Sequence, residues 1–144
     1  MSCQKNIQES LDSCLFFTVK KMDRALNKLA AEAFQTVGMA PTYAFILLIL
    51  AEEDGRLQKD IAQILYIAPS TLTRLIEKLV YKGYVTTLTE GRTRKVYLTV
   101  NGRELLPDIR EAWDNLHTRY KAILGDAYAN DLASIMNINS EKLR

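Results

Sequence analysis

Apolar residues recur at spacings of three and four from residue 7 to about residue 36, and no proline or glycine interrupts them. This period predicts one long amphipathic helix. A helix of that length would extend about 45 Å. Because a chain of 144 residues does not need so long a helix for its own core, we expect a second copy of the chain to cover part of the apolar stripe.

The middle of the chain predicts three further helices and a hairpin. Pro41 begins a helix to about Glu53 that is apolar nearly all round and therefore central. A short helix over residues 57–65, a break at 66–68 and a helix from Pro69 to about Lys82 follow, ending at Gly83. The β-rich runs 84–89 and 95–99 flank turn residues 90–94 and predict a hairpin with a cationic tip. The positions predicted to face inward on the two short helices are Leu57, Ile61, Ile64, Leu65, Leu72, Leu75, Ile76, Leu79 and Val80.

Helical spacing returns from Val100 to about Leu124, with Thr99 as the cap and a bend near Pro107. A last short helix is predicted from Ala127 to about Met136. The predicted fold class is therefore mainly α with a small β-hairpin (α+β).

Composition indicates one ordinary domain, because 48% of the residues are hydrophobic and 25% are charged. The longest apolar run, from Ala44 to Ala51, is far shorter than the roughly 20 residues of a membrane span. The polar first residues predict no secretory signal, and two cysteines, Cys3 and Cys14, are too few for a disulfide scaffold. We expect a cytoplasmic protein without a membrane partner.

The net charge of +2 hides a strong segregation along the chain. Residues 1–54 carry five basic and seven acidic side chains, residues 55–103 carry nine and three, and residues 104–144 carry five and seven. The basic middle is suited to a polyanion, because each phosphate contact by Lys or Arg releases condensed counterions. A solvated face without a partner is the alternative that charge alone leaves open.

Residues 57–99 predict a winged helix-turn-helix, because two short helices joined by a tight turn are followed there by a basic hairpin. Its second helix fits the major groove of DNA, where hydroxyl and guanidinium groups can reach base edges. Arg74 is the candidate for a bidentate guanine contact worth about 1 to 3 kcal/mol, while Lys78 and Lys82 are placed to meet phosphates. The candidate DNA-binding residues are Ser70, Thr71, Thr73, Arg74, Lys78, Lys82, Arg92, Arg94 and Lys95.

Four segments of this region resemble the MarR family of bacterial transcriptional regulators: residues 57–62, 69–79, 82–85, and 98–102, the last with the pattern Leu-Thr-x-x-Gly. The resemblance extends over essentially the whole chain. It implies a homodimer in which residues 1–37 and 100–144 form a helical dimerisation region. Residues 41–99 would present the winged helix-turn-helix to a pseudo-palindromic double-stranded DNA operator.

The wing departs from the family pattern in two respects. The signature Asp-x-Arg falls on Glu90-Gly91-Arg92, so that glutamate replaces aspartate, and the hairpin is about three residues shorter than usual. A shorter wing reaches less far into the minor groove. Either Arg92 or Arg94 can be its tip residue.

Cys14 lies in a segment that resembles the peroxide-sensing helix of the OhrR-like branch of this family. The resemblance implies that oxidation of Cys14 to a sulfenic acid releases DNA. Tyr43 stands at one of the tyrosine positions of that branch, but Ala40 and Lys28 stand at others. The alternative is that Cys14 is a small buried hydrophobe. A disulfide from Cys3 to Cys14 of a partner chain is also left open.

The family's other sensing mode implies a cleft for a small aromatic or phenolic ligand. Its candidate lining residues are Phe16, Phe17, Tyr43, Phe45 and Trp113, and ordinary core packing is their alternative role. With one histidine, no metal-ligand spacing of cysteines and no phosphate loop, we predict neither an enzyme nor a metal site nor a cofactor.

The sequence thus favours a DNA-binding transcriptional regulator, a repressor that is homodimeric and is released by thiol oxidation or by a small ligand. The alternative from another class is a dimeric winged-helix module that binds protein and not DNA.

Overall fold

The computed structural model describes residues 6–144, so Cys3 lies outside the described residues. The chain divides into two compact units. One consists of the described residues up to Ala33 together with Asn115–Arg144, and the other is Phe34–Asp114. Among the described residues, no helix combines the length and the apolar character that crossing a bilayer requires.

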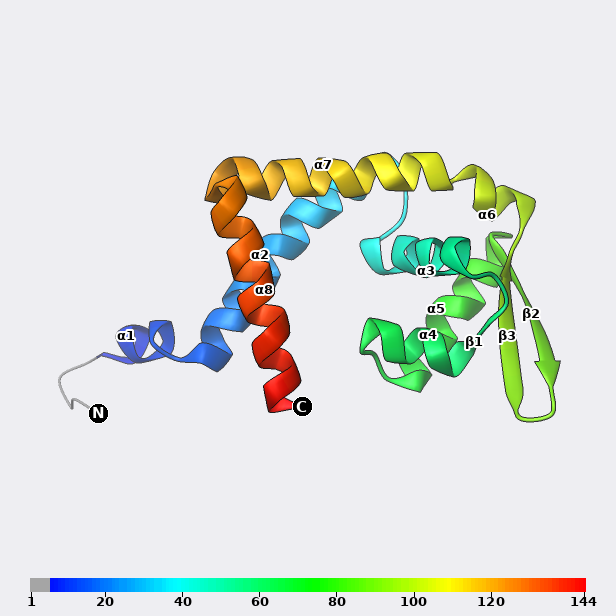
Figure 1. Cartoon of the computed structure of the whole chain (residues 1–144), viewed down its shortest axis with the longest axis horizontal. Coiled ribbons are helices and arrows are strands. Elements are labelled where there is room, and N and C mark those ends of the chain that lie inside the picture. Colours follow the sequence, from blue (N-terminus) through cyan, green and yellow to red (C-terminus); the bar gives the residue numbers. More distant parts are fainter. Residues whose placement is uncertain (1–5) are drawn as a thin grey trace. The chain divides into compact units, whose positions relative to one another are not determined.

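The second unit contains the helix-turn-helix and its wing (Figure 1). It is built from α3 (Pro41–Glu52), β1 (Arg56–Leu57), α4 (Gln58–Leu65), α5 (Pro69–Tyr81), β2 (Val85–Glu90), β3 (Thr93–Leu98), α6 (Val100–Glu104) and the first half of α7 (Leu106–Leu124). The antiparallel sheet has the order β1-β3-β2. The predicted fold class is confirmed. The core is formed by fully buried side chains from α3, α4, α5, β2, β3 and α7, among them Leu47, Leu50, Ile61, Leu72, Ile76, Leu79, Val85, Val96 and Ile109.

The turn of the helix-turn-helix follows the predicted break at residues 66–68. Tyr66 ends α4 in the left-handed conformation at φ 55°, which reverses the chain within one residue. Ala68 is the N-cap of α5, and Pro69 takes the first helical position, where its missing N–H costs nothing.

The hairpin turn is tighter than predicted. Glu90 pairs with Thr93, so only Gly91 and Arg92 lie between the strands, and the Thr93 hydroxyl donates to the Glu90 carbonyl oxygen at 2.8 Å. Gly91 has φ 61°, as a two-residue hairpin turn requires. The five-residue turn predicted over residues 90–94 is therefore wrong. The strand β2 ends at Glu90, and β3 already begins at Thr93.

The wing also has a third strand that the sequence did not predict. Arg56 pairs with Val96 and Leu57 with Lys95, so β1 extends the hairpin into a three-stranded sheet. Leu57 was assigned to the following helix, which begins at Gln58. A strand of two residues has no period to detect.

Two positions predicted to face inward are instead exposed. Ile64 in α4 is 46% exposed and Val80 in α5 is 39% exposed. The buried residues of α4 are Ile61 and Ala62, so the small Ala62 side chain takes the core position that the apolar pattern assigned to Ile64.

The first unit contains α1 (Ile7–Asp12), most of α2 (Leu15–Phe34), the second half of α7 and α8 (Asp126–Leu143). The single long helix predicted here is wrong, because Ser13 and Cys14 interrupt it. The Ser13 hydroxyl donates to the Glu9 carbonyl oxygen at 2.9 Å, and such local bonds compete with helix continuation. Arg119 of α7 forms an ion pair with Glu32 of α2 at 3.0 Å.

The C-terminal helices also differ from their predicted lengths. Thr99 caps α6 as predicted, accepting a bond from the Gly102 N–H at 3.1 Å. The bend expected near Pro107 is a break at Leu105, and Pro107 lies in the first turn of α7. The last helix extends to Leu143, well beyond Met136, since no proline or glycine stops it.

Candidate nucleic-acid interface

The exposed face of α5 carries polar and cationic side chains at helical spacing. Ser70, Arg74, Lys78 and Tyr81 are exposed, whereas Leu72, Ile76 and Leu79 on the opposite side are buried. Lys82 follows at the C-cap and is exposed as well. The helix therefore presents a guanidinium and two ammonium groups to solvent on the face opposite the core.

Thr71 and Thr73 of α5 are half-buried, although both were predicted to face outward. The Thr73 hydroxyl accepts a bond from Gln58 Nε2 at 2.8 Å and donates to the Pro69 carbonyl oxygen at 3.0 Å. The hydroxyl expected to reach base edges is thus engaged within the protein.

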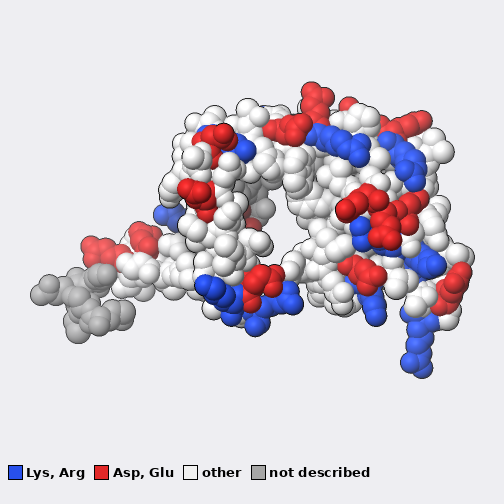
Figure 2. Space-filling model, in the orientation of Figure 1, with Lys and Arg blue, Asp and Glu red and all other residues white. Residues whose placement is uncertain are grey.

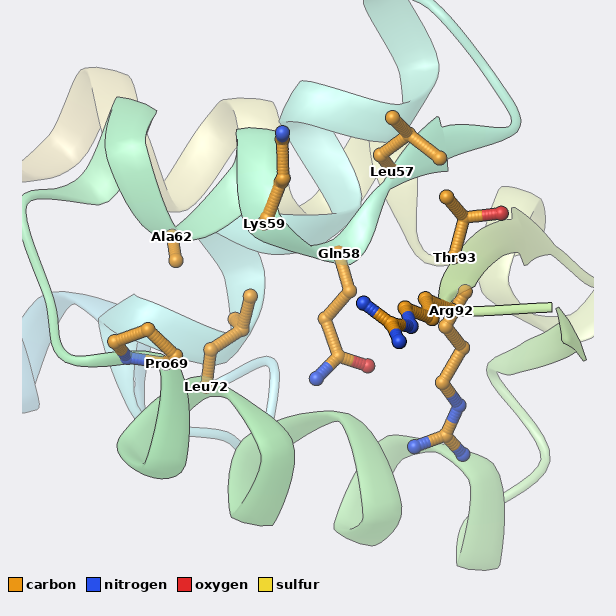
Figure 3. Close-up of a pocket in the computed structure, with 9 residues that line it drawn as sticks. Leu57, Gln58, Lys59, Ala62, Pro69, Leu72, Arg92 and Thr93 are labelled. Carbon is orange, nitrogen blue, oxygen red and sulfur yellow. The ribbon is translucent and has the colours of Figure 1, made fainter. Parts of the chain in front are cut away.

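A hollow of about 200 Å³ lies between α4, α5 and the wing. Lys59 of α4 and Arg92 and Arg94 of the wing line it, together with Gln58, whose Oε1 is buried and has no hydrogen-bond partner among the described residues. Figure 3 shows Gln58 reaching from α4 toward α5, with the side chain of Arg92 beside it. Sequence reasoning missed Gln58 and Lys59, whose only signal was a polar position at the start of a short helix.

The three basic side chains of the wing differ in exposure: Arg92 is exposed, whereas Arg94 and Lys95 are half-buried. Arg92 lies in the turn and is exposed, and Figure 2 shows a basic side chain projecting from the free end of the hairpin. Arg94 lies within β3, where its Nη2 donates to Thr87 Oγ1 at 3.2 Å across the hairpin. Lys95 is half-buried opposite Leu88. Arg92 is therefore the tip residue, which the sequence left open between Arg92 and Arg94.

Lys78 is positioned by an aromatic ring. Its Nζ lies 5.6 Å from the centroid of the Tyr43 ring, within cation–π range. Both residues line a hollow of about 180 Å³ with Lys82 and Tyr84.

Comparison with known proteins shows what the middle of the chain resembles. The sequence model of the MarR family matches residues 37–95, a segment that begins before α3 and ends within β3. Over this segment the chain is similar to the MarR family. No curated protein sequence matches the chain significantly.

Solved structures share the fold of this chain beyond that segment. The transcriptional repressor CouR bound to a 23-mer DNA duplex is similar with a TM-score of 0.83 at 20% identity, covering 95% of this chain and 99% of CouR. CouR from Rhodococcus jostii RHA1 bound to p-coumaroyl-CoA gives 0.74 at 21% identity, over 88% and 91%. MepR from S. aureus in complex with DNA gives 0.78 at 16% identity, over 91% and 98%. At these identities, the likeness shows the fold.

The candidate sensor, Cys14, lies at a helix break. Cys14 is exposed between α1 and α2, so its thiol is not part of the core of the described chain. The neighbouring Phe16 is also exposed, with Lys20 Nζ 4.9 Å from the centroid of its ring.

The five cleft candidates do not form one group within either unit. Phe45 packs edge-on against Trp113 at 5.1 Å and against Phe34 at 6.3 Å between ring centroids. Tyr43 lines the hollow that also contains Lys78, and none of those three packed aromatic residues lines that hollow. Phe16 and Phe17 belong to the first unit, whereas the other three candidates belong to the second.

Proposed function

We propose that this chain is a sequence-specific DNA-binding transcriptional regulator that acts as a homodimeric repressor. The observation that carries the proposal is the exposed face of α5, where Ser70, Arg74 and Lys78 stand beside a wing that ends in Arg92. A helix of this kind fits the major groove, and the turn of a hairpin fits the minor groove or the backbone. DNA-bound CouR and MepR, which share the fold, support the same mode of binding.

The contacts divide by chemistry into those that select a sequence and those that fix position. Arg74 is exposed in the second turn of α5 and is placed to bind a guanine edge with two hydrogen bonds. Lys78 and Lys82 lie farther along the helix and bind phosphates as point charges. The hollow lined by Lys59, Arg92 and Arg94 receives a backbone phosphate between the wing and α5, which is the recognition helix of the proposal.

The first unit supports dimerisation. Of the residues of α8, all of which the structure describes, Ala129 alone is buried, and a helix in water draws most of its stability from a packed face. An apolar groove of about 470 Å³ runs between α2, α7 and α8 and is lined by side chains such as Leu15, Met22, Leu132 and Met136. A second copy of the chain, bound through the same unit, covers this groove and places two recognition helices on two half-sites.

The proposal includes two ways in which the repressor could be released from DNA. Oxidation of the exposed Cys14 thiol is one. Binding of a small aromatic ligand is the other, and it is supported by CouR, which shares the fold and binds p-coumaroyl-CoA.

Salt dependence of DNA binding tests the proposal against a protein-binding winged helix. Duplexes are selected from a random library, and their affinity is measured as salt rises. Because several phosphates per dimer are neutralised, affinity is expected to fall by about 10³ or more between roughly 50 and 200 mM salt. Arg74→Ala is expected to relax preference at one base position, whereas Lys78→Ala weakens all duplexes alike. Selection of no duplex, or an affinity indifferent to salt, would overturn the proposal.

A further inference from the structure

The hydroxyl group of Thr73 is engaged in two hydrogen bonds within the protein, as donor in one and as acceptor in the other. It donates its proton to the Pro69 carbonyl oxygen at 3.0 Å, and it accepts a hydrogen bond from Gln58 Nε2 at 2.8 Å. A threonine hydroxyl has one proton to give. Thr73 therefore has no donor left for guanine N7 and O6 or for thymine O4.

Gln58 keeps the hydroxyl in this arrangement. Its amide lies in the hollow between α4, α5 and the wing, where Oε1 is buried without a partner among the described residues. Figure 3 shows the side chain directed from α4 toward α5. Turning Thr73 away would leave Nε2 without its acceptor beside an oxygen that already lacks a donor, and buried polar groups without partners are costly. DNA binding is therefore not expected to release the hydroxyl.

The remaining group of the Thr73 side chain beyond Cβ is its methyl group, Cγ2. Thr73 is half-buried and directly precedes the exposed Arg74 in the part of the recognition helix that meets base edges. In the major groove the threonine methyl group packs against the C5-methyl group of thymine. We infer that Thr73 selects thymine through methyl contact and that Gln58 is the positioning residue that orients it. This inference rests on the proposed function.

Replacement of thymine by deoxyuracil tests the inference without changing the protein, because it removes only the C5-methyl group. In a duplex selected by the chain, each thymine of one half-site is replaced in turn. At one position the affinity is expected to fall roughly fourfold, the factor for one methyl group withdrawn from water. The other thymines are expected to tolerate the change.

Two matched variants separate the methyl group from the hydroxyl group. Thr73→Ser keeps the hydroxyl and is expected to bind thymine and deoxyuracil duplexes equally. Thr73→Val keeps the methyl group and is expected to retain the preference. The double variant Gln58→Met with Thr73→Val removes both hydrogen-bonding partners and should retain it too, whereas Gln58→Glu, which has no proton to donate to the hydroxyl, should reduce it. Thermal unfolding checks that every variant is folded.

The outcomes distinguish the inference from the function on which it rests. A chain that selects no duplex overturns both. A chain that binds duplex DNA but shows no thymine preference at any position overturns the inference alone. Loss of the preference in Thr73→Val with its retention in Thr73→Ser assigns recognition to the hydroxyl and likewise overturns it.

Discussion

Asp54 and Arg103 form an ion pair at 2.9 Å that joins the turn after α3 to α6. The second carboxylate oxygen of Asp54 accepts a bond from the Leu98 N–H at 2.9 Å, so a single side chain holds the end of β3. Asp54→Ala is expected to lower the free energy of unfolding by about 1 to 3 kcal/mol, mainly because the part-buried Leu98 N–H loses its acceptor. Chemical denaturation measures the loss. Asp54→Asn keeps an acceptor and should cost less, and equal losses would mean that charge dominates.

Gly102 packs against the backbone of Tyr84. A Cβ atom at position 102 would collide with the Tyr84 carbonyl oxygen, which accepts the Thr99 N–H at 3.1 Å. Gly102→Ala is therefore expected to destabilise the fold by roughly 1 to 3 kcal/mol, although alanine ordinarily favours a helix. Asn101→Ala, at the exposed neighbouring position, is the control and should leave the melting temperature nearly unchanged. A stabilised Gly102→Ala variant would contradict this packing.

The two arginines of the wing are expected to respond differently to substitution. Arg92→Ala should reduce DNA affinity and lower the salt slope by about 1 without affecting stability, because Arg92 is exposed in the turn. Arg94→Ala should also lower stability, since it removes the bond to Thr87. Affinity at several salt concentrations and thermal unfolding measure both effects. Arg92→Lys, which retains the charge, should preserve the slope, and an unchanged slope in Arg92→Ala would exclude a phosphate contact.

Charge in the apolar groove of the first unit is expected to prevent dimerisation. Met22 and Leu132 line this groove, and Met22→Asp or Leu132→Asp would bury a carboxylate against the partner. Light scattering should then report a monomer, and DNA affinity should fall because one half-site is lost. Ala31→Asp, on an exposed position of α2 outside the groove lining, is the control. Monomeric wild-type protein would refute the dimer.

Oxidation of Cys14 is testable by comparison with Cys14→Ser. Because the thiol is exposed, organic hydroperoxide should reach it and release DNA from the wild-type protein but not from the variant. A gel-shift titration with peroxide measures the difference, and added dithiothreitol should restore binding. Equal release from both proteins would assign sensing to another group.

The hydrophobic pattern was sufficient to predict most of the helices and the hairpin, because long periodic segments bury one face. It was insufficient where single side chains decide the backbone. The Ser13 hydroxyl ends a helix whose apolar spacing continues, and the pairing of Glu90 with Thr93 sets a turn shorter than its polar residues indicate.

The candidate DNA-binding residues were chosen from their type and helical position, which locates Arg74 and Lys78 on the exposed face of α5. The same reasoning could not reveal that Gln58 occupies the Thr73 hydroxyl, since the two residues are 15 positions apart and meet only in the folded chain. Long-range pairs of this kind have no local sequence signal.

The strand β1 connects the wing directly to the helix-turn-helix. Leu57 ends the strand that pairs with β3, and Gln58 begins α4, so no loop separates the wing from the helix-turn-helix. Rotation of α4 would therefore shear the sheet. The base of the wing is thus joined to the helix-turn-helix, and we expect each half-site to need a matching spacing between the base edge that Arg74 contacts and the groove that Arg92 enters.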